Sequence, residues 1–376
     1  MKDLNCFFIG ANHNFLGGIS LFQRNLIEYL KLVYPKAKIT LAYPSKESEV
    51  FFKERVEYRG LKTIFEGLIG DLVFNMKVVS FLKRNNFEII NSHAIWGYWM
   101  NFYRKPKGQK IVHTYHGVSY YFFKNHLKRF SFFKKILFSP LLFFSYFIEK
   151  PPVKKADKII CVSEKVRRQV EKLYGKKGNI VVIRTGVDLK DFKFRDKKNM
   201  KKKLGLKMEN FYGLYVGRGG YWTKGLDRVV EISKEIYKQD KRYRLIVVGA
   251  DYKKTKHLLD EKFIIYREKV ERKDMPYYYN ASDLFFCMSR YEGGAPTLVV
   301  SEAMASGCLV VCTKSAEQEI IKDKKNGLII EEFGEKEVRK ILENLGNKKI
   351  ISNAKKTVGE LSLKKWGEKY LNTLLK

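Results

Sequence analysis

The stretch RYEGGAPTLVVSEAMASG, residues 290–307, decides the fold. It follows a short apolar run at residues 284–288, which predicts a buried strand. Gly293, Gly294 and Pro296 then lead into a predicted helix, because proline suits the first helical position, where the amide has no partner inside the helix. A buried strand followed by a glycine-rich turn and a helix is typical of a parallel α/β sheet.

The start of this helix predicts a site for an anion such as a phosphate. The amides of Thr297, Leu298 and Val299 would point out of the helix N-terminus, where the helix dipole favours negative charge. Glu302 follows among apolar residues, where an unpaired carboxylate is costly, and a ligand with two hydroxyls would satisfy it. Together these features describe a bound nucleotide. The alternative is that Glu292 lies at the surface and that Glu302 bonds to a neighbouring side chain.

The two glutamates and the motif EAMASG at residues 302–307 resemble the signature of glycosyltransferase family 4, the retaining nucleotide-sugar enzymes. In that family the glutamates are usually eight positions apart. Here Glu292 and Glu302 are ten positions apart, so two residues are inserted in the turn. The insertion leaves the role of Glu292 open.

The resemblance implies an α/β protein with the GT-B fold, in which two Rossmann-like parallel-sheet domains face each other across a cleft. Residues 1–190 would form an N-terminal domain that binds the acceptor. Residues 191–355 would form the domain that binds the nucleotide sugar. Residues 356–376 would form a C-terminal helix that packs back on the first domain.

Composition supports two folded domains. The chain has 376 residues, of which 45% are hydrophobic, enough for two cores and too apolar for a disordered protein. No signal peptide is evident, and no apolar run reaches the roughly 18–20 residues that a membrane span needs. The five cysteines lie mostly in apolar runs, without a CxxC pair. This pattern predicts buried thiols, no zinc site, and a cytoplasmic location that includes the inner face of the membrane.

Short apolar runs alternate with helical patterns along the chain, which predicts parallel βαβ units. Expected strands lie at residues 4–9, 38–43, 87–91, 110–115, 158–162, 179–183, 211–216, 245–249, 263–266, 284–288 and 309–312. Expected helices lie at residues 19–32, 72–84, 164–174, 225–237 and 273–281. Ligands of such sheets bind at the carboxyl ends of the strands.

Two glycine-containing loops follow predicted strands and supply further candidates for the donor site. Gly17 and Gly18 open a helix and allow the backbone to approach a ligand closely. In the second half, Arg218 and Lys224 lie in GRGGYWTKG, residues 217–225, and can converge on one anion. The alternative is an ordinary loop with two solvated basic side chains.

The resemblance assigns roles to these residues. It implies that Arg218 and Lys224 hold the nucleotide diphosphate in place of a metal ion and stabilise it as it leaves. No metal or cofactor is therefore expected, and a UDP- or GDP-linked sugar would be the co-substrate. Glu302 would bind the ribose. The other donor-site residues would be Gly17, Gly18, Gly293, Gly294, Pro296, Thr297 and Leu298.

His116 and Glu292 are the predicted catalytic residues. His116 lies in HTYHG, residues 113–117, just past a predicted strand, and the family has a histidine near the transferred sugar at this position. His93 is a weaker candidate of the same kind. A lone histidine at a strand end is more often structural, and only the family context favours a functional role.

Residues 118–152 are crowded with aromatic and basic side chains. One interpretation is a peripheral contact with an anionic membrane, which would suit a lipid-linked acceptor. The other is a connecting helix packed on the N-terminal domain. The net charge of +34 likewise predicts attraction to polyanions or, alternatively, a lysine-rich solvated surface.

The sequence thus predicts a retaining, metal-independent glycosyltransferase. It would move a sugar from a nucleotide diphosphate sugar to a glycan, a lipid-linked acceptor or another hydroxyl. One alternative is a sugar-nucleotide epimerase of the same fold. Another is a non-catalytic basic protein that binds nucleic acid or an anionic membrane, although no nucleic-acid-binding module is recognisable and nucleic acid is not the expected partner.

Overall fold

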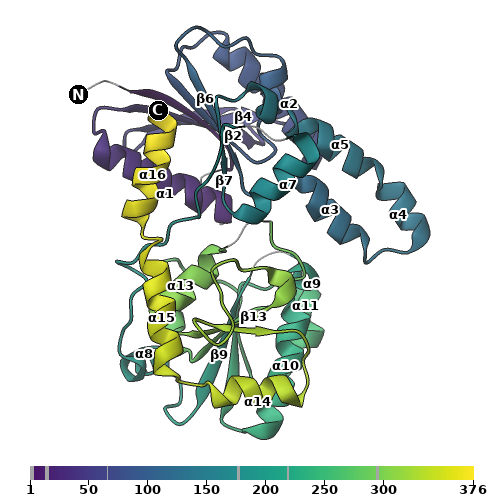
Figure 1. The fold of residues 1–376 in the computed structure, drawn as a ribbon, viewed down its shortest axis with the longest axis vertical. Coiled ribbons are helices and arrows are strands. Elements are labelled where there is room, and N and C mark those ends of the chain that lie inside the picture. The colour runs from purple at the N-terminus through teal and green to yellow at the C-terminus, as the bar shows by residue number, and fades with distance from the viewer. Residues whose placement is uncertain (1–3, 13–16, 66, 176–177, 218–219, 294–295) are drawn as a thin grey trace. The chain divides into compact units, whose positions relative to one another are not determined.

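The protein is described from a computed structural model, which describes residues 4–12, 17–65, 67–175, 178–217, 220–293 and 296–376. The chain divides into two compact units (Figure 1). Unit 1 contains Met1–Gly186 and Leu363–Lys376, and unit 2 contains Val187–Ser362. The domain boundaries expected from the sequence were residues 190 and 355.

In the described part of unit 1, eight strands form one sheet in the order β3-β4-β2-β1-β5-β6-β7-β8. Every neighbouring pair is parallel except β3 and β4, which form an antiparallel edge. The strands are β1 Asn5–Ile9, β2 Lys38–Ser45, β3 Glu49–Lys53, β4 Val56–Lys62, β5 Ile89–His93, β6 Lys110–Tyr115, β7 Lys158–Cys161 and β8 Ile180–Val182.

The helices of unit 1 are α1 Gly18–Val33, α2 Gly67–Leu82, α3 Ser119–Leu127, α4 Phe132–Phe138, α5 Pro140–Glu149, α6 Pro151–Lys155, α7 Glu164–Tyr174 and α16 Leu363–Leu375, with a 3-10 turn, η1, at Tyr98–Asn101. α16 is the last helix of the chain and packs against α1. Its Gly367 is needed for this close approach, because a Cβ there would lie 2.4 Å from the Tyr29 ring. The Tyr370 hydroxyl of α16 donates to Asn91 Oδ1 of β5 over 3.1 Å.

In the described part of unit 2, six strands form a parallel sheet in the order β11-β10-β9-β12-β13-β14. They are β9 Phe211–Val216, β10 Tyr243–Val248, β11 Ile264–Arg267, β12 Leu284–Cys287, β13 Leu309–Thr313 and β14 Leu328–Ile330. The helices are α8 Lys197–Lys203, α9 Tyr221–Lys224, α10 Leu226–Gln239, α11 Tyr252–Leu259, α12 Met275–Ala281, α13 Leu298–Ser306, α14 Glu335–Glu343 and α15 Lys348–Gly359, with a 3-10 turn, η2, at Lys314–Ala316.

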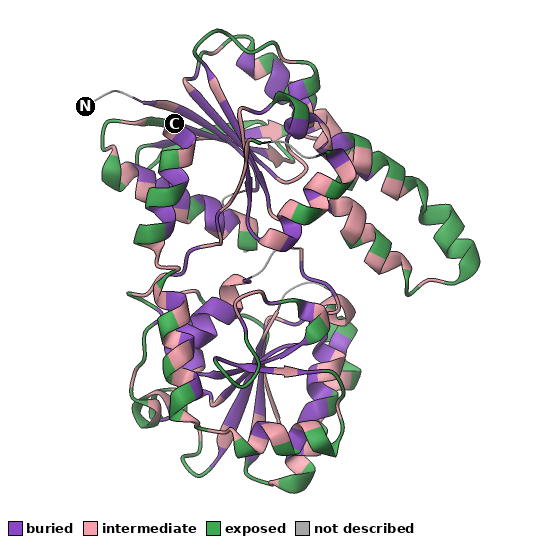
Figure 2. Ribbon diagram, in the orientation of Figure 1, coloured by how far each residue is buried: buried purple, intermediate pink, exposed green. Residues whose placement is uncertain are grey.

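Each unit buries its sheet between helices (Figure 2). The strands are mostly buried on both faces, which explains why they read as continuous apolar runs. All five cysteines are buried and free of disulfides, as the sequence predicted. The expectation of two Rossmann-like parallel-sheet domains is confirmed.

Three local predictions were wrong. Strands β3, β4 and β14 were not predicted, because β3 is a largely exposed edge strand, β4 has no continuous apolar run and β14 is very short. Residues 118–152 form several helices rather than one, because α4 ends before Ser139 and Pro140 begins α5. α13 begins at Leu298 and not at Pro296, since Thr297 has an extended backbone, with φ −73° and ψ 147°, and acts as the N-cap.

Candidate active site

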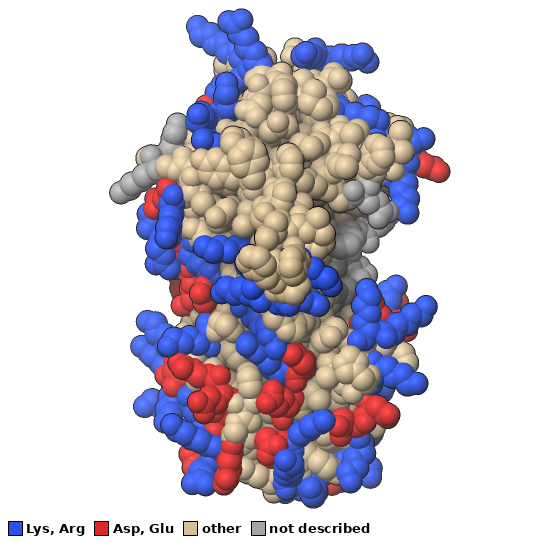
Figure 3. Space-filling model, turned by 90° about the vertical axis from the view of Figure 1, so that its right-hand side faces the viewer, with Lys and Arg blue, Asp and Glu red and all other residues tan. Residues whose placement is uncertain are grey.

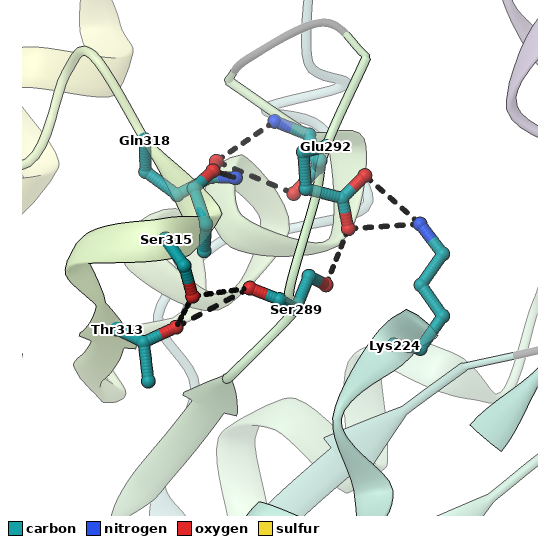
Figure 4. Close-up of polar contacts among 8 residues, drawn as sticks. Lys224, Ser289, Glu292, Thr313, Ser315 and Gln318 are labelled. Atoms are coloured by element: carbon teal, nitrogen blue, oxygen red, sulfur yellow. Dashed lines mark hydrogen bonds and ion pairs between the residues drawn. The ribbon is translucent and has the colours of Figure 1, made fainter. Parts of the chain in front are cut away.

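The centre of the candidate site is an ion pair between Lys224 and Glu292 at the carboxyl ends of β9 and β12 (Figure 4). Lys224 Nζ lies 2.8 Å from Glu292 Oε1 and 2.9 Å from Oε2. The Ser289 hydroxyl donates to Glu292 Oε1 over 2.5 Å. Glu292 is buried, so its carboxylate is held in one orientation by a cation and a hydroxyl.

The pairing favours the charged form of Lys224. Burial lowers the pKa of Lys224, but the charge and hydrogen bonds of Glu292 raise that pKa by more, and the net shift is upward. The Lys224 side chain still keeps 38% of its surface exposed, so a ligand can reach it. An anion placed here would meet an ammonium group whose charged form is favoured.

Arg290 joins the two loops that carry this pair. Its guanidinium donates to both carboxylate oxygens of Asp227 over 2.8 and 2.7 Å, and to the Trp222 carbonyl over 2.6 Å. It also lies over the Trp222 ring, 4.5 Å from the centroid. The loop after β12 is thereby fixed to the start of α10, which sets Lys224 against Glu292.

The same junction requires a glycine. Gly225 has a left-handed backbone with φ +72°, which side chains rarely adopt. A Cβ at this position would also lie 2.0 Å from the Met288 carbonyl oxygen. Any larger residue would push α9 and α10 away from the end of β12.

The loop beneath Glu292 is held by hydroxyls from the end of β13 and from η2 (Figure 4). The Ser289 carbonyl accepts from Ser315 Oγ over 2.9 Å and from Thr313 Oγ1 over 3.4 Å. Arg228 of α10 donates to Ser315 Oγ over 3.0 Å. β13 therefore contributes to the rigidity of the site without supplying one of its predicted residues.

The N-terminus of α13 differs from the prediction in one respect. The Thr297 amide, expected to be free for a phosphate, donates to Gln318 Oε1 over 3.0 Å, and the Thr297 hydroxyl donates to the same oxygen over 3.4 Å. The amides of Leu298 and Val299 occupy the first two helical positions, where the helix offers no acceptor. Gln318 would therefore compete with an incoming anion for the Thr297 amide. Nothing in the sequence indicated this contact.

Glu302 is buried in α13 and has two protein partners. Arg272 Nη2 lies 2.6 Å from Oε1, and the Tyr279 hydroxyl donates to Oε2 over 3.0 Å. Burial raises the pKa of Glu302, and Arg272 and Tyr279 oppose this rise. Arg272 also stacks over Phe192, 4.3 Å from the ring centroid. This arrangement matches the alternative in which a neighbouring side chain satisfies Glu302, and its assignment to a ribose stays a prediction.

Arg272 is the residue that sequence reasoning missed. It lies in REKVERK, residues 267–273, where basic side chains follow one another without a period that distinguishes one from the next. Only the return of α13 beside α12 brings Arg272 to Glu302. An apolar helix that contains one carboxylate was the only available signal that a cation should be nearby.

In unit 1, Gly17 caps α1 and Gly18 begins it, as expected. A Cβ at Gly18 would meet no atom within 4 Å, so the protein's own packing does not require a glycine there. Gln23 of α1 accepts from the Ala11 amide over 3.0 Å and connects the helix to the end of β1. A role of the two glycines toward a phosphate stays a prediction.

His116 lies just past β6, as predicted, and pairs with His93 at the end of β5. His93 Nδ1 and His116 Nε2 are 3.0 Å apart, and the edge of Phe22 packs on both rings. Burial lowers the pKa of His116 to about 3 and that of His93 well below its usual value. Both imidazoles are neutral at physiological pH, so one ring donates the shared hydrogen bond and the other accepts it.

Two predicted donor-site residues, Arg218 and Gly294, fall outside the described residues. Gly293 is half-buried and Pro296 is buried between Glu292 and α13. The structure thus brings Lys224, Glu292 and the start of α13 to one edge of the unit 2 sheet. It places Gly17, Gly18 and His116 at the carboxyl ends of strands in unit 1.

Comparison with known proteins covers both units. A family model described as Glycosyltransferase Family 4 matches residues 17–191, and one described as Glycosyl transferases group 1 matches residues 196–357. An uncharacterized glycosyltransferase of Methanocaldococcus jannaschii is 26% identical over 363 residues, which is 92% of this chain and 88% of the relative. A second glycosyltransferase of that organism is 24% identical over 268 residues, 68% of this chain and 64% of the relative.

Solved structures share the fold of the whole chain. Sucrose-phosphate synthase from Thermosynechococcus elongatus superposes with a TM-score of 0.80 at 16% identity, over 98% of each chain. WaaG, a glycosyltransferase involved in lipopolysaccharide biosynthesis, gives 0.78 at 17% identity, over 98% of this chain and 99% of WaaG. HepE from Anabaena, solved in complex with UDP and glucose, gives 0.71 at 18% identity, over 99% of each chain. With a family model on each half and this fold, the chain belongs to glycosyltransferase family 4.

Proposed function

We propose that this protein is a retaining glycosyltransferase that takes its sugar from a nucleoside diphosphate sugar. The observation that carries the proposal is the Lys224–Glu292 ion pair at the carboxyl edge of the unit 2 sheet, next to the N-terminus of α13. Ligands of parallel α/β sheets bind at this edge. Membership of the glycosyltransferase family supports the same reading, and HepE was solved with UDP and glucose.

In this proposal the donor's negative charge lies against Lys224 and the first amides of α13. Lys224 neutralises the diphosphate, and the Leu298 and Val299 amides donate to it. Gln318 releases the Thr297 amide, which then joins them. Arg218 and the turn at Gly293, Gly294 and Pro296 complete the donor site according to the family resemblance.

Glu292 binds the sugar of the donor. Its carboxylate is fixed by Lys224 and Ser289 and accepts hydrogen bonds from the sugar hydroxyls. The bond between the anomeric carbon and the phosphate oxygen breaks, and the acceptor oxygen bonds to the same face of that carbon. The acceptor's proton passes to the departing phosphate oxygen, so no enzyme nucleophile and no metal ion take part.

The remaining assignments concern the ribose, the acceptor and the location. Glu302 accepts from the ribose hydroxyls, which requires them to share the carboxylate with Arg272 and Tyr279. His116 lies by the transferred sugar or the acceptor hydroxyl. The acceptor is a glycan, a lipid-linked saccharide or another hydroxyl, and a cytoplasmic location would supply the nucleotide sugar.

The first experiment is calorimetric titration of the purified chain with UDP, GDP, ADP and a short DNA duplex. We expect saturable binding of UDP or GDP, unchanged by a metal chelator. The Glu302→Gln variant should weaken binding of the ribonucleotide and leave that of the 2′,3′-dideoxy analogue unchanged. DNA binding without nucleotide preference would overturn the proposal in favour of a polyanion-binding protein.

A second measurement addresses the reaction itself. The donor is incubated with the protein, and the anomeric configuration of any product is read by NMR. Retention of configuration with release of nucleoside diphosphate supports the proposal. Inversion contradicts it, and a rearranged sugar without nucleotide release indicates an epimerase.

A further inference from the structure

A helical hairpin in unit 1 carries an unusual surface. It consists of residues 119–149, which form α3, α4 and α5, and it extends from the rest of the unit (Figure 1). We call it the aromatic hairpin. α3 and α5 pack on each other, and α4 lies at the tip between them. None of the helices in the described ranges has the length and hydropathy needed to cross a bilayer.

The tip of the aromatic hairpin exposes apolar side chains on several sides of one helix. Every residue of α4 is exposed, and five of its seven residues are large and apolar. Their exposed fractions are Phe132 71%, Phe133 81%, Ile136 57%, Leu137 70% and Phe138 39%. Phe143, Phe144 and Phe147 of α5 add to this surface, with 63%, 51% and 46% exposed. Soluble proteins rarely leave such a patch in water unless it meets a partner or a membrane.

The exposed charges of the aromatic hairpin all have one sign, because its single carboxylate, Glu149, is buried. Residues 119–148 contain five Lys and Arg, namely Lys124, Lys128, Arg129, Lys134 and Lys135, and no Asp or Glu. Viewed from the side on which the aromatic hairpin extends, Lys and Arg border an uncharged surface of unit 1 (Figure 3). A surface that is both apolar and basic complements an anionic bilayer, which offers acyl chains beneath negative headgroups.

The distribution of apolar side chains around α4 favours a bilayer over a protein groove as the partner. At 3.6 residues per turn, its five apolar residues spread over most of the circumference, and Lys134 and Lys135 lie between them. A groove covers one face of a helix and would leave part of this surface in water. A bilayer surrounds an inserted tip, and the long lysine stems let their ammonium groups reach the headgroups.

We propose that the aromatic hairpin inserts the tip of α4 into the surface of an anionic lipid bilayer. The five cations draw the hairpin to the headgroups, and Phe132, Phe133 and their apolar neighbours enter the acyl boundary. This inference stands on the exposed side chains and does not depend on the proposed glycosyl transfer, which is measured without vesicles.

The test is co-sedimentation of the full chain with phosphatidylcholine vesicles and with vesicles in which a third of the lipid is phosphatidylglycerol. We expect binding to the anionic vesicles and at least tenfold less to the neutral ones. Lys134→Gln with Lys135→Gln should weaken binding about 30-fold, at about 1 kcal/mol per cation. The control pair Lys198→Gln and Lys202→Gln removes the same charge from exposed lysines of α8 and should change binding by less than about threefold.

Insertion is separated from adsorption by the apolar variants. Phe132→Ser with Phe133→Ser should weaken binding by about tenfold or more. Leu32→Ser with Phe52→Ser, at residues 74% and 76% exposed elsewhere in unit 1, should leave it unchanged. Equal losses in both pairs would overturn the proposal, as would the absence of binding to either vesicle.

A fluorescent label reports the position of the tip directly. All five native cysteines are buried, so Phe133→Cys introduces one accessible thiol for a polarity-sensitive dye. Anionic vesicles should shift its emission to the blue, and the dye on a Phe52→Cys variant should not respond. Binding without a shift at residue 133 would contradict insertion. Self-association of the protein that Phe132→Ser and Phe133→Ser abolish would assign the surface to a second copy instead.

Discussion

In unit 2 the buried carboxylates Glu292 and Glu302 face cations, whereas in unit 1 Glu149, His93 and His116 face neutral partners. Glu292 pairs with Lys224 and Glu302 with Arg272. Glu149, buried at the base of the aromatic hairpin, accepts from the Ser119 amide over 2.8 Å and from its hydroxyl over 2.7 Å. His93 and His116 of unit 1 bond to each other.

The difference shows that the two units offer their ligands different electrostatic environments. In a buried ion pair each charge is compensated by its partner, and a partner that is removed leaves a charge that a charged ligand could compensate. Buried groups with neutral partners shift toward their uncharged forms, which suits hydroxyl-rich or apolar ligands. Under the proposed function, unit 2 is the part suited to a diphosphate and unit 1 the part suited to a neutral sugar or acceptor.

Breaking the alignment of the unit 2 ion pair should have the largest effect. Gly225→Ala adds a Cβ that would lie 2.0 Å from the Met288 carbonyl oxygen, in a left-handed backbone. We expect a loss of about 3 kcal/mol or more in the free energy of unfolding of unit 2, measured by urea denaturation. Gly205→Ala is the control, because Gly205 has a similar φ of +66° with no atom within 4 Å of the added Cβ. The free energy of unfolding of this control should fall by only about 1 kcal/mol. Equal losses in the two variants would contradict the close approach of Gly225 to Met288.

The contribution of Glu149 to the free energy of unfolding depends on pH, and this dependence tests whether its surroundings in unit 1 are neutral. Burial raises the pKa of Glu149 from 4.5 to about 7, against the opposing hydrogen bonds from Ser119. Between these two values the folded protein binds more protons than the unfolded chain, so this group's contribution to stability falls as pH rises. We expect the loss to reach about 3 kcal/mol at pH above 7.

Glu149→Gln isolates this contribution. The variant should gain stability relative to the native chain as pH rises through this window, measured as the difference between their urea midpoints. The buried histidines titrate in both proteins and cancel in the difference. A difference that does not change with pH would mean that Glu149 is ionised throughout and that unit 1 does provide it with a charged partner.

Removal of Lys224 tests whether the unit 2 ion pair serves the donor. Lys224→Met should weaken binding of the nucleoside diphosphate by about 1.5–3 kcal/mol, the range for a charge-assisted hydrogen bond, or roughly 10- to 150-fold. Calorimetry measures the change. Lys234→Met removes an exposed ion pair with Glu261 in the same unit and should leave donor affinity unchanged. Unaltered affinity in Lys224→Met would remove the ion pair from the donor site.

The smallest predicted effect concerns the geometry of Arg290. Arg290→Lys keeps the charge but loses the paired hydrogen bonds to Asp227 and the stacking on Trp222. We expect a loss of about 1 kcal/mol in the free energy of unfolding. Arg242→Lys, at an exposed pair with Asp240, should cost less than about 0.5 kcal/mol. Equal costs would show that Arg290 acts only through its charge.

Helices and strands with one dominant hydrophobic period could be predicted from the sequence alone. The run at residues 110–115 predicted β6 to the residue, and the pattern at 164–174 predicted α7, whose Ser163 cap accepts from the Val166 amide. β3 and β4 were missed because hydrogen bonds to neighbouring strands hold them in the sheet, without a continuous buried apolar run that the sequence would reveal. The start of α13 was misplaced because proline also suits the extended residues before an N-cap.

The sequence by itself determined the two parallel sheets, the burial of the cysteines, the strand-end position of His116 and the burial of Glu302, because each follows from local hydrophobic pattern. Only the tertiary structure decided the partners. Lys224 meets Glu292 across 68 residues of sequence, and Arg272 reaches Glu302 from the turn that precedes α12. Which cation faces which carboxylate depends on how strands order themselves in a sheet and how loops meet at its edge, and no local pattern encodes that.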